Sequence, residues 1–489
     1  MQPGACRPVN YRYDSGMNHH AIITSLTKML GENAVLTQPQ DQQPYVTPWR
    51  GAIAGKALAI VFPTSTEQVA GTVALCAQHH IPLVPQGGNT GLAGGSVPDT
   101  SGTEIVLSLS RMKRIREIDT TNHTAIVEAG CILASLHDAL VPHDRIFPMH
   151  IASEGSAMIG GIIATNAGGN NVLRYGTTRE LVLGLEVVLP DGKIWHGLKK
   201  LRKDNTGYDL KQLFMGAEGT LGIITAACLK LFHTHRQTET AFIGLPSAEA
   251  ALALLTKLRQ ASGDRVHAFE YISDTALTLV TTHIPGHPHP LGEIYPCYLL
   301  IELATAQPGD DLRSLLESTL ADAMAEGLVL NAAIAESTSQ ARQFWSLREH
   351  ISEAERQIGK GIHFDISVPV SAVPAFLTHA DAVIAHAIPE ATIVAFGHMG
   401  DGNIHYNLSL PKTITPEAFA ETKNTAAKVI YPLLKTHHGS ISAEHGIGTL
   451  RRSDLAAFKP ALDLQLMRKI KQAIDPENQM NPGRVITTD

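Results

Sequence analysis

The chain has 489 residues, of which 44% are hydrophobic and 17% charged, so it is a folded globular protein of two or three domains and not a disordered one. Its net charge of −7 and the lack of a basic cluster exclude nucleic acid as the main partner. It has five scattered cysteines, no signal-type N-terminal core and no apolar run near the ~20 residues of a membrane span, so we expect a cytoplasmic protein without a disulfide framework.

The first part of the chain combines a polar extension with one helix. Residues 1–16 predict the extension, which leaves Met17 as an alternative start, and residues 18–31 have a helical pattern. A Pro- and Gln-rich connection then leads to Trp49. Strand and helix alternate after it, with a strand at 57–61, a helix at 66–79 behind a Thr64/Ser65 cap, and a strand at 82–85.

Residues 86–95 follow this strand as a glycine-rich loop. Successive glycines let backbone amides turn inward and form a concave nest that suits a pyrophosphate. The glycine spacing is not that of the Rossmann fingerprint, and residues 96–102 predict a loop rather than a helix. A flexible turn is an equally good interpretation of this stretch taken alone.

Residues 147–169 form a second glycine-rich stretch, after strands at 104–107 and 125–128 and a helix at 133–140. Its small residues would let the main chain approach a flat ligand, with Thr165 and Asn166 as polar groups, and a close-packed turn is the alternative. A third glycine cluster at 214–225 follows a strand at 183–189, the Asp191-Gly192 hairpin turn and a return strand at 193–196.

After about Arg236 the order of elements is typical of an α+β domain, an antiparallel sheet with helices on one side. Three histidines among prolines between residues 283 and 290 predict a surface loop in preference to a metal tract. We expect strands at 241–245, 298–303, 328–335, 363–370, 392–396 and 404–410, and helices at 248–261, 310–326, 340–358, 373–388 and 465–474.

Residues 396–407 hold the candidate metal ligands. Asp401 and Gly402 favour a two-residue type I′ turn, which would make His398 and His405 direct cross-strand partners, with Asn407 on the same face. Glu444 is the best candidate for a third ligand, because two histidines and one carboxylate with open positions suit zinc, iron or manganese. Packing or surface chemistry is the alternative for this histidine pair.

Arg348, Ser352 and Arg356 recur every four residues in the helix predicted at 340–358 and therefore share a face. A solvated charged stripe is the ordinary interpretation of this pattern. The alternative is a carboxylate clamp, because a guanidinium offers a planar pair of donors that matches a carboxylate.

Six motifs in order between residues 49 and 485 resemble the flavoenzyme superfamily of vanillyl-alcohol oxidase and p-cresol methylhydroxylase, and within it the D-2-hydroxyglutarate and D-lactate dehydrogenase branch. They are Pro85-x-Gly-Gly-x-Thr-Gly91, Ile159-Gly-Gly with Thr165-Asn-Ala-Gly-Gly169, Gly216-x-Glu-Gly-Thr-Leu-Gly222, Gly397-His-x-Gly-Asp-Gly-Asn-x-His-x-Asn407, Ala443-Glu-His-Gly-x-Gly448 and Asn481-Pro-Gly483.

The resemblance implies an α+β fold with a two-part FAD-binding domain and an antiparallel-sheet substrate domain with flanking helices. It divides the chain into an N-terminal extension and FAD-binding domain at 1–235, a substrate and metal domain at 236–440, and a C-terminal segment at 441–489 that returns to the FAD domain. No histidine occupies the first glycine loop, where some relatives attach the cofactor covalently, so we expect non-covalent FAD. The implied FAD contacts are Pro85, Gly87, Gly88, Asn89, Thr90, Gly91, Gly155, Ser156, Gly160, Gly161, Thr165, Asn166, Gly168, Gly169, Glu218, Gly222, Ile224 and Asn481.

The resemblance also implies a divalent metal, with zinc favoured, bound by His398, His405 and Glu444. A small D-2-hydroxy acid would be oxidised to the 2-oxo acid, with its hydride passing to flavin N5 and the electrons to a separate acceptor, a quinone or an electron-transfer flavoprotein. The oligomeric state stays open, with a homodimer as one arrangement. The implied roles are His445 as base, Asn407 as substrate support, and Arg348 with Ser352 as carboxylate ligands.

Two positions depart from the pattern of this branch. His363 stands where a lysine meets the distal carboxylate of hydroxyglutarate, which puts a dicarboxylate preference in doubt and favours lactate-like or longer 2-hydroxy acids. Ile162 stands where asparagine is frequent after the Gly-Gly pair, which would alter one flavin contact.

Two other functions remain as alternatives. One is a flavin-independent iron oxygenase with two histidines and one carboxylate, which would be colourless when purified. The other is a flavin-binding electron-transfer or assembly subunit without its own substrate, against which the intact His445 and both metal imidazoles argue.

Overall fold

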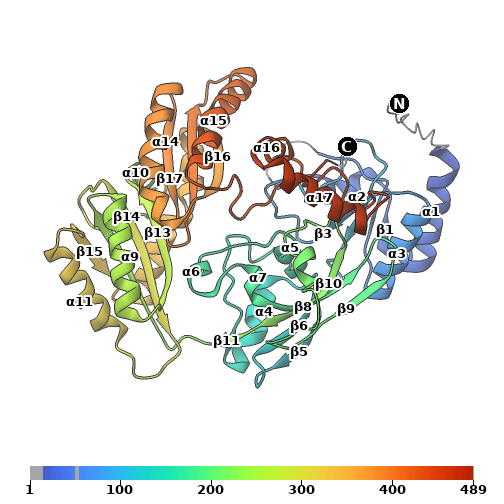
Figure 1. The fold of residues 1–489 in the computed structure, drawn as a ribbon, viewed down its shortest axis with the longest axis horizontal. Helices are drawn as coiled ribbons and strands as arrows, with labels where there is room; N and C mark the ends of the chain where they lie inside the picture. The colour runs from blue at the N-terminus through green and yellow to red at the C-terminus, as the bar shows by residue number, and fades with distance from the viewer. Residues whose placement is uncertain (1–14, 50–53, 488–489) are drawn as a thin grey trace, which may run out of the picture.

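The computed structural model describes residues 15–49 and 54–487, so most of the polar extension predicted at 1–16 lies outside the described residues. The chain forms two lobes, and the last helices return from the second lobe to the first (Figure 1). Within the described residues no helix is long and apolar enough to cross a membrane. Cys76, Cys131, Cys228 and Cys297 are free and buried, and Cys6 lies outside the described residues.

The first lobe begins with a four-stranded sheet of order β1-β2-β4-β3, in which β2 and β3 run parallel to β4. Ser65 caps the helix that connects β2 to β3, because its hydroxyl accepts the Gln68 amide at 3.3 Å. The elements are α1 (Ser15–Leu30), η1 (Glu32–Ala34), β1 (Val35–Leu36), α2 (Pro39–Val46), β2 (Ala59–Val61), α3 (Thr66–Gln78), β3 (Leu83–Gln86) and β4 (Ile105–Ser108).

A five-stranded antiparallel sheet of order β5-β6-β10-β8-β9 completes the first lobe and shares its main hydrophobic core. The predicted Asp191-Gly192 hairpin joins β8 to β9, with Gly192 at φ 80°. The elements are β5 (Ile115–Asp119), β6 (Thr124–Glu128), α4 (Leu133–Leu140), η2 (Val141–His143), β7 (Arg145–Ile146), α5 (Ile159–Ala164), α6 (Val172–Tyr175), α7 (Thr178–Leu181), β8 (Val182–Val188), β9 (Ile194–Gly197), α8 (Lys211–Phe214), β10 (Ile223–Lys230) and β11 (Phe232–His233).

The second lobe is built on a seven-stranded antiparallel sheet of order β15-β12-β14-β13-β17-β18-β16. Its elements are β12 (Gln237–Leu245), α9 (Ala248–Ser262), β13 (Val266–Ser273), α10 (Asp274–His283), β14 (Cys297–Thr305), α11 (Leu312–Ala325), β15 (Asn331–Ile334), α12 (Thr338–Glu349), α13 (Ile351–Ile358), β16 (Gly359–Ser367), η3 (Val370–Ala372), α14 (Val373–Ala387), β17 (Thr392–His398), β18 (Asn403–Pro411) and α15 (Pro416–Thr436). The returning helices are α16 (Arg452–Phe458) and α17 (Ala461–Ile474).

Helices flank both faces of this sheet, so the prediction of helices on one side was wrong. Successive strand residues point to opposite faces, and here both sets are apolar. Ile243 and Ile301 belong to the core shared with α9, α11, α14 and α15, whereas Phe242 and Leu300 belong to the core shared with α10, α12 and α13. The site described below lies on the sheet face that carries this second, smaller core.

Several elements were missing from the sequence prediction. The connection before Trp49 contains β1 and α2, although α2 has a proline inside it. Strands β5 and β13 and helices α10, α15 and α16 were not predicted, and the helix predicted at 340–358 is two helices divided at His350. The histidines of the 283–290 segment contact neighbouring side chains, His287 with Ser346 and His289 with Tyr298, as expected of a loop packed on the surface.

The central hairpin has a different register from the one predicted. Phe396 pairs with His405 across β17 and β18, and His398 pairs instead with Glu270 of β13 on the other side. The connection is a four-residue turn at 399–402 rather than the two-residue type I′ turn, with Gly402 at φ 86°. The two histidines are therefore not direct cross-strand partners.

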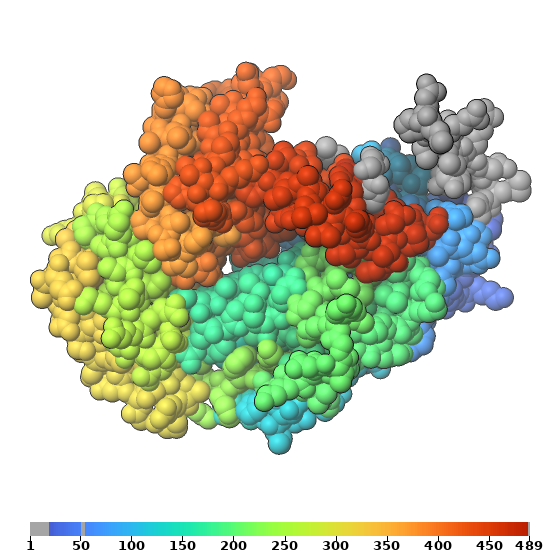
Figure 2. All heavy atoms as spheres, viewed as in Figure 1, coloured from blue at the N-terminus to red at the C-terminus, as the bar shows by residue number. Residues whose placement is uncertain are grey.

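The C-terminal segment lies against β3 of the first lobe. Leu83 donates its amide to Gln479 at 2.9 Å and accepts the Asn481 amide at 2.8 Å. The buried ion pair of Arg484 with Glu104, at 2.6 Å, fastens the end of the chain beside β4. Figure 2 shows the segment after residue 440 crossing from the second lobe to the first on this face.

Candidate active site

His398, His405 and Glu444 come together although the hairpin register differs from the prediction. One ligand atom from each lies within 4.8 Å of the others, and the two imidazole centroids are 5.6 Å apart. Burial holds the pKa of His405 well below its usual value, which favours the neutral imidazole, the form that binds a metal. The three side chains therefore fit a divalent cation.

Glu270 fixes the orientation of His398. Its carboxylate accepts a hydrogen bond from Nδ1 of His398 at 2.6 Å and from Nε of Arg348 at 2.8 Å. Burial alone would raise the pKa of Glu270, but the two neighbouring cations hold it at about 2. Burial would likewise lower the pKa of His398, but Glu270 raises it to about 9, so the site favours positive charge on this imidazole. A metal at Nε2 would supply that charge.

Asp365 organises the Glu444–His445 turn. Its Oδ2 accepts the backbone amides of Glu444 at 3.1 Å and His445 at 2.9 Å, and its Oδ1 accepts from Asn403. Nδ1 of His445 lies 3.4 Å from the same carboxylate, and Nε2 lies 3.6 Å from Glu444. Burial would raise the pKa of Asp365, but His445 and His405 lower it to about 2. This arrangement directs Nε2 of His445 toward Glu444. We refer to His398, His405 and Glu444 together as the metal group.

The residues predicted to bind the substrate, Arg348, Ser352 and Asn407, lie on elements around the metal group. The helix face predicted to hold Arg348, Ser352 and Arg356 differs at its last member. Arg348 is largely buried, and its guanidinium lies 4.7 Å above the ring of Phe396. Ser352 is half-buried on α13. Arg356 is exposed, because the break at His350 changes the direction of the helix. Glu355 takes the place predicted for Arg356 on the buried face of α13. Asn407 donates to Glu355 at 2.9 Å.

The first two glycine-rich stretches, residues 86–95 and 147–169, pack closely against each other. A Cβ at Gly88 would be 2.0 Å from the carbonyl oxygen of Ser156, and one at Gly87 would be 3.4 Å from Met158. In contrast, a Cβ at Gly91, Gly155 or Gly161 would have no neighbour within 4 Å, so backbone faces open space there. Bare backbone beside open space suits a pyrophosphate and a flavin, and these residues fit FAD.

Four of the residues predicted to contact FAD adopt left-handed backbone conformations, and their side chains form hydrogen bonds with backbone atoms of neighbouring segments. They are Asn89, Asn166, Glu218 and Asn481, with φ between 47° and 53°. Asn89 donates to the Thr47 carbonyl at 2.9 Å, and Asn166 accepts the Arg179 amide at 2.9 Å. These side chains shape the loops of the site.

Glu218 and Asn481 connect three segments of the site, the glycine-rich loop 86–95, the glycine cluster 214–225 and the C-terminal segment after residue 440. Glu218 accepts the amides of Ile447 and Gly448 at 2.7 and 2.8 Å, and Asn481 donates to the carbonyls of Gly95 and Glu218 at 2.9 and 2.7 Å. Asn481 Oδ1 is buried without a hydrogen-bond partner among the described residues, so an acceptor is left facing this junction.

The other predicted FAD residues differ in how far they are open to a ligand. Ser156 is exposed and Thr90 half-buried, whereas Thr165 donates to the Gly161 carbonyl of its own helix. The packed residues are Pro85, Gly160, Gly169, Gly222 and Ile224. A Cβ added at Gly160, Gly169 or Gly222 would meet Ala129, His150 or Val187 respectively, and one added at Gly219 would meet Pro85. The Ile224 side chain lies in the core.

Gly168 is the point at which the predicted flavin-binding segment comes near the predicted metal ligands. A Cβ at this position would lie 3.4 Å from Oε2 of Glu444. The segment predicted to line the flavin, residues 165–169, therefore passes a predicted metal ligand with room for no more than one added methyl group between them.

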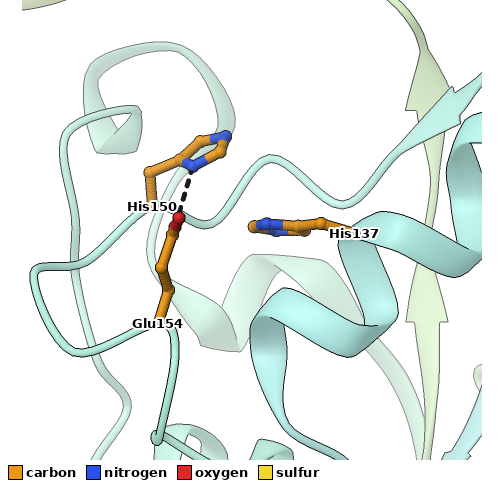
Figure 3. Close-up of side chains that lie close together, drawn as sticks. All are labelled: His137, His150 and Glu154. Carbon is orange, nitrogen blue, oxygen red and sulfur yellow. Dashed lines mark hydrogen bonds and ion pairs between the residues drawn. The ribbon is translucent and has the colours of Figure 1, made fainter.

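A second group of potential metal ligands, His137, His150 and Glu154, lies in the first lobe (Figure 3). His150 contacts Glu154 at 3.1 Å as an i, i+4 pair, with their side chains 50% and 41% exposed, and His137 contacts the Phe147 carbonyl. A half-exposed pair of this kind is ordinary surface electrostatics, so the largely buried group in the second lobe is the better candidate for a metal site.

Sequence reasoning missed Glu270, Asp365 and Glu355. The signal available was a charge inside an apolar strand pattern, as in Val266 to Ser273, where Glu270 stands among Phe269, Tyr271 and Ile272. A buried charge needs a partner, and a partner far along the chain is not visible in the sequence.

Residues 234–485 match the family described as FAD linked oxidases, C-terminal domain, and residues 57–197 match the FAD binding domain family. The chain therefore belongs to the FAD-linked oxidases and is an FAD-dependent oxidoreductase. Among solved structures it is similar to p-cresol methylhydroxylase (TM-score 0.75, 17% identity, 96% of this chain and 97% of that one) and to alkyldihydroxyacetonephosphate synthase (TM-score 0.70, 17% identity, 98% and 87%). These likenesses confirm the predicted superfamily fold.

The similar relatives are more specific than the fold. The chain is 36% identical to a D-2-hydroxyglutarate dehydrogenase of Xanthomonas citri pv. viticola over 95% of this chain and 97% of that protein. It is 35% identical to the enzyme of the same name from Stutzerimonas stutzeri over 96% and 99%, and 36% identical to the mitochondrial enzyme of Bos taurus over 93% and 81%. The predicted branch of the superfamily is thus confirmed.

Proposed function

We propose that the chain is an FAD- and metal-dependent dehydrogenase that oxidises a D-2-hydroxy acid to the 2-oxo acid. The observation that carries the proposal is the proximity of Glu444, in the largely buried metal group, to Gly168, in the segment that would line the flavin: a Cβ added at Gly168 would lie 3.4 Å from Oε2 of Glu444. Relatives named D-2-hydroxyglutarate dehydrogenase along nearly the whole chain support the same reaction.

When bound, the metal would lower the pKa of the substrate hydroxyl and FAD would accept the hydride. His398 and His405 with Glu444 would hold the metal, with zinc favoured because zinc uses two histidines and a carboxylate in catalytic sites. Nε2 of His445 would take the hydroxyl proton, and Asp365 beside Nδ1 would stabilise the resulting imidazolium.

The remaining residues would bind and orient the substrate. Arg348 and Ser352 would receive a carboxylate, and Asn407 would hold the substrate beside the metal. FAD would be bound without a covalent bond, and a separate acceptor, a quinone or an electron-transfer flavoprotein, would take its electrons. The match to an FAD binding domain family argues against the flavin-independent oxygenase.

The test is a screen of D- and L-2-hydroxy acids with a dye acceptor, before and after chelation of the purified yellow protein. We expect turnover of D-isomers that chelation removes and zinc or another divalent cation restores. Turnover that is unaffected by complete metal removal would exclude the metal from the reaction. A protein that binds flavin and oxidises no 2-hydroxy acid would favour the electron-transfer subunit.

A further inference from the structure

The sheet face that carries the metal group continues into a second polar row. Asp365 pairs with His405, and two residues along the same strands His363 pairs with Asn407. Residues two apart in a strand share a face and are about 7 Å apart, which is roughly the full length of an extended five-carbon acid from the oxygens at one end to those at the other. This second row therefore lies where the far end of a bound 2-hydroxy acid would reach.

Glu355 enters this row from α13. Its carboxylate is 1% exposed, accepts from Nδ2 of Asn407 at 2.9 Å through Oε2, and lies 3.4 Å from Nε2 of His363 through the same oxygen. Gly361 makes room for it, because a Cβ there would be 2.8 Å from Glu355 Oε1 and 2.5 Å from His363 Nε2.

Two oxygens of this row are buried without a hydrogen-bond partner in the described part of the chain, Oε1 of Glu355 and Oδ1 of Asn407. Both are acceptors. An unsatisfied buried acceptor is costly, and native proteins pair such groups with a ligand, a water or another side chain. A group that satisfies both oxygens must donate hydrogen bonds.

The charge balance points the same way. Arg348, which would receive one substrate carboxylate, already balances the charge of Glu270 at 2.8 Å, so it adds little net positive charge for a second one. A second carboxylate at the far end of the substrate would lie beside Glu355, and two buried carboxylates repel each other. The row thus disfavours the distal carboxylate of a dicarboxylic acid.

We propose that Glu355 and Asn407 select a D-2-hydroxy acid whose side chain ends in a hydrogen-bond donor, a hydroxyl or an amide, and that they reject a distal carboxylate. The inference rests on the proposed function for its substrate position. It assigns Glu355 as a specificity residue in addition to those implied by the resemblance, and it separates this chain from relatives named for a dicarboxylate.

The test uses three acids of one chain length: D-2-hydroxyglutarate, its 5-amide, and D-2-hydroxyvalerate, which end in a carboxylate, a donor and a methyl group. We expect the holoenzyme to favour the 5-amide over the dicarboxylate in kcat/KM by about tenfold or more, because an unpaired buried acceptor discriminates strongly. Glu355→Gln should reduce that ratio by about tenfold, whereas Glu353→Gln, on the exposed face of the same helix, should leave it unchanged.

Binding of the 2-oxo products to the oxidised enzyme, followed by the change in flavin absorbance, gives a readout independent of turnover. The 5-amide of 2-oxoglutarate should bind more tightly than 2-oxoglutarate, and Glu355→Gln should narrow the difference. Equal affinities, or a dicarboxylate preference that Glu355→Gln does not change, would overturn the inference while leaving the dehydrogenase reaction intact. Failure of every 2-hydroxy acid to reduce the flavin would instead overturn the proposed function.

Discussion

Glu270 and His398 are cross-strand partners of β13 and β17, joined by a 2.6 Å hydrogen bond from the imidazole Nδ1 to the carboxylate. The same carboxylate binds Arg348, so one buried acid orients a predicted metal ligand and a predicted substrate ligand together. Outer partners of this kind set the ring orientation and the basicity of metal-binding histidines.

Glu270→Gln is therefore expected to weaken zinc binding by about 10–100-fold, the usual effect of losing an outer partner of a metal ligand. The measurement is zinc content and zinc affinity of the purified protein, with FAD content as an internal control. Glu249→Gln, an exposed acid on α9, should change neither quantity. Full zinc occupancy in the Glu270 variant, with turnover intact, would show that Glu270 serves only packing.

His405→Ala is expected to abolish turnover and keep the yellow cofactor, because its imidazole belongs to the metal group and not to the glycine-rich stretches. Flavin absorbance and metal content are measured on the same preparation. The exposed His438→Ala serves as the control for the loss of a histidine. Loss of flavin in the His405 variant would mean that the residue supports the fold.

The six motifs were sufficient to predict the superfamily and the proximity of His398, His405 and Glu444, because the resemblance implies these three side chains as one ligand set whatever the strand register. The hairpin register was not predictable in the same way. The Asp-Gly pair favours a two-residue turn locally, but pairing of His398 with Glu270, 128 residues away, requires a longer one.

The two-sided packing of the second sheet was missed for a related reason. Strands β12, β13 and β14 are apolar on both faces, and without β13 and α10 in the prediction nothing covered the second face. The long α15 was missed because Pro432 lies inside it, and its buried residues Ala426, Ile430 and Leu434 show that tertiary packing overrides the local penalty.

Gly88→Ala is expected to lower the free energy of unfolding of the FAD-free protein by about 1–3 kcal/mol, because the added Cβ would lie 2.0 Å from the Ser156 carbonyl oxygen. Gly91→Ala is the matched control, since its Cβ would have no neighbour within 4 Å in the same loop. Denaturant unfolding of both apo variants gives the comparison. Equal stability of the two would mean that the glycine-rich stretches can separate without cost.

Gly91→Ala tests the cofactor separately from the fold. It is expected to keep the stability of the apo protein and to weaken FAD binding, because the open space beside Gly91 is where we place the pyrophosphate. FAD affinity is measured by fluorescence titration of the apo variant. Unchanged affinity would move the pyrophosphate away from this loop.

Arg484→Met is expected to cost about 3–5 kcal/mol of unfolding free energy, because it leaves Glu104 as an uncompensated buried charge. The double variant Arg484→Met/Glu104→Leu should recover much of this loss, since replacing both charges removes the unpaired one. Lys193→Met, in an exposed ion pair with Asp191, should have no measurable effect. A double variant as unstable as the single one would show that the arginine acts through its bonds to the Val97 and Pro482 carbonyls instead.

His363→Lys is expected to improve the use of D-2-hydroxyglutarate relative to D-lactate, because lysine brings a full positive charge to the row where the distal carboxylate would lie. Glu355, 3.4 Å from His363, would pair with the new ammonium and limit the gain. The ratio of kcat/KM for the two acids should therefore rise further when His363→Lys is combined with Glu355→Gln. A ratio that neither variant changes would remove both residues from the substrate pocket.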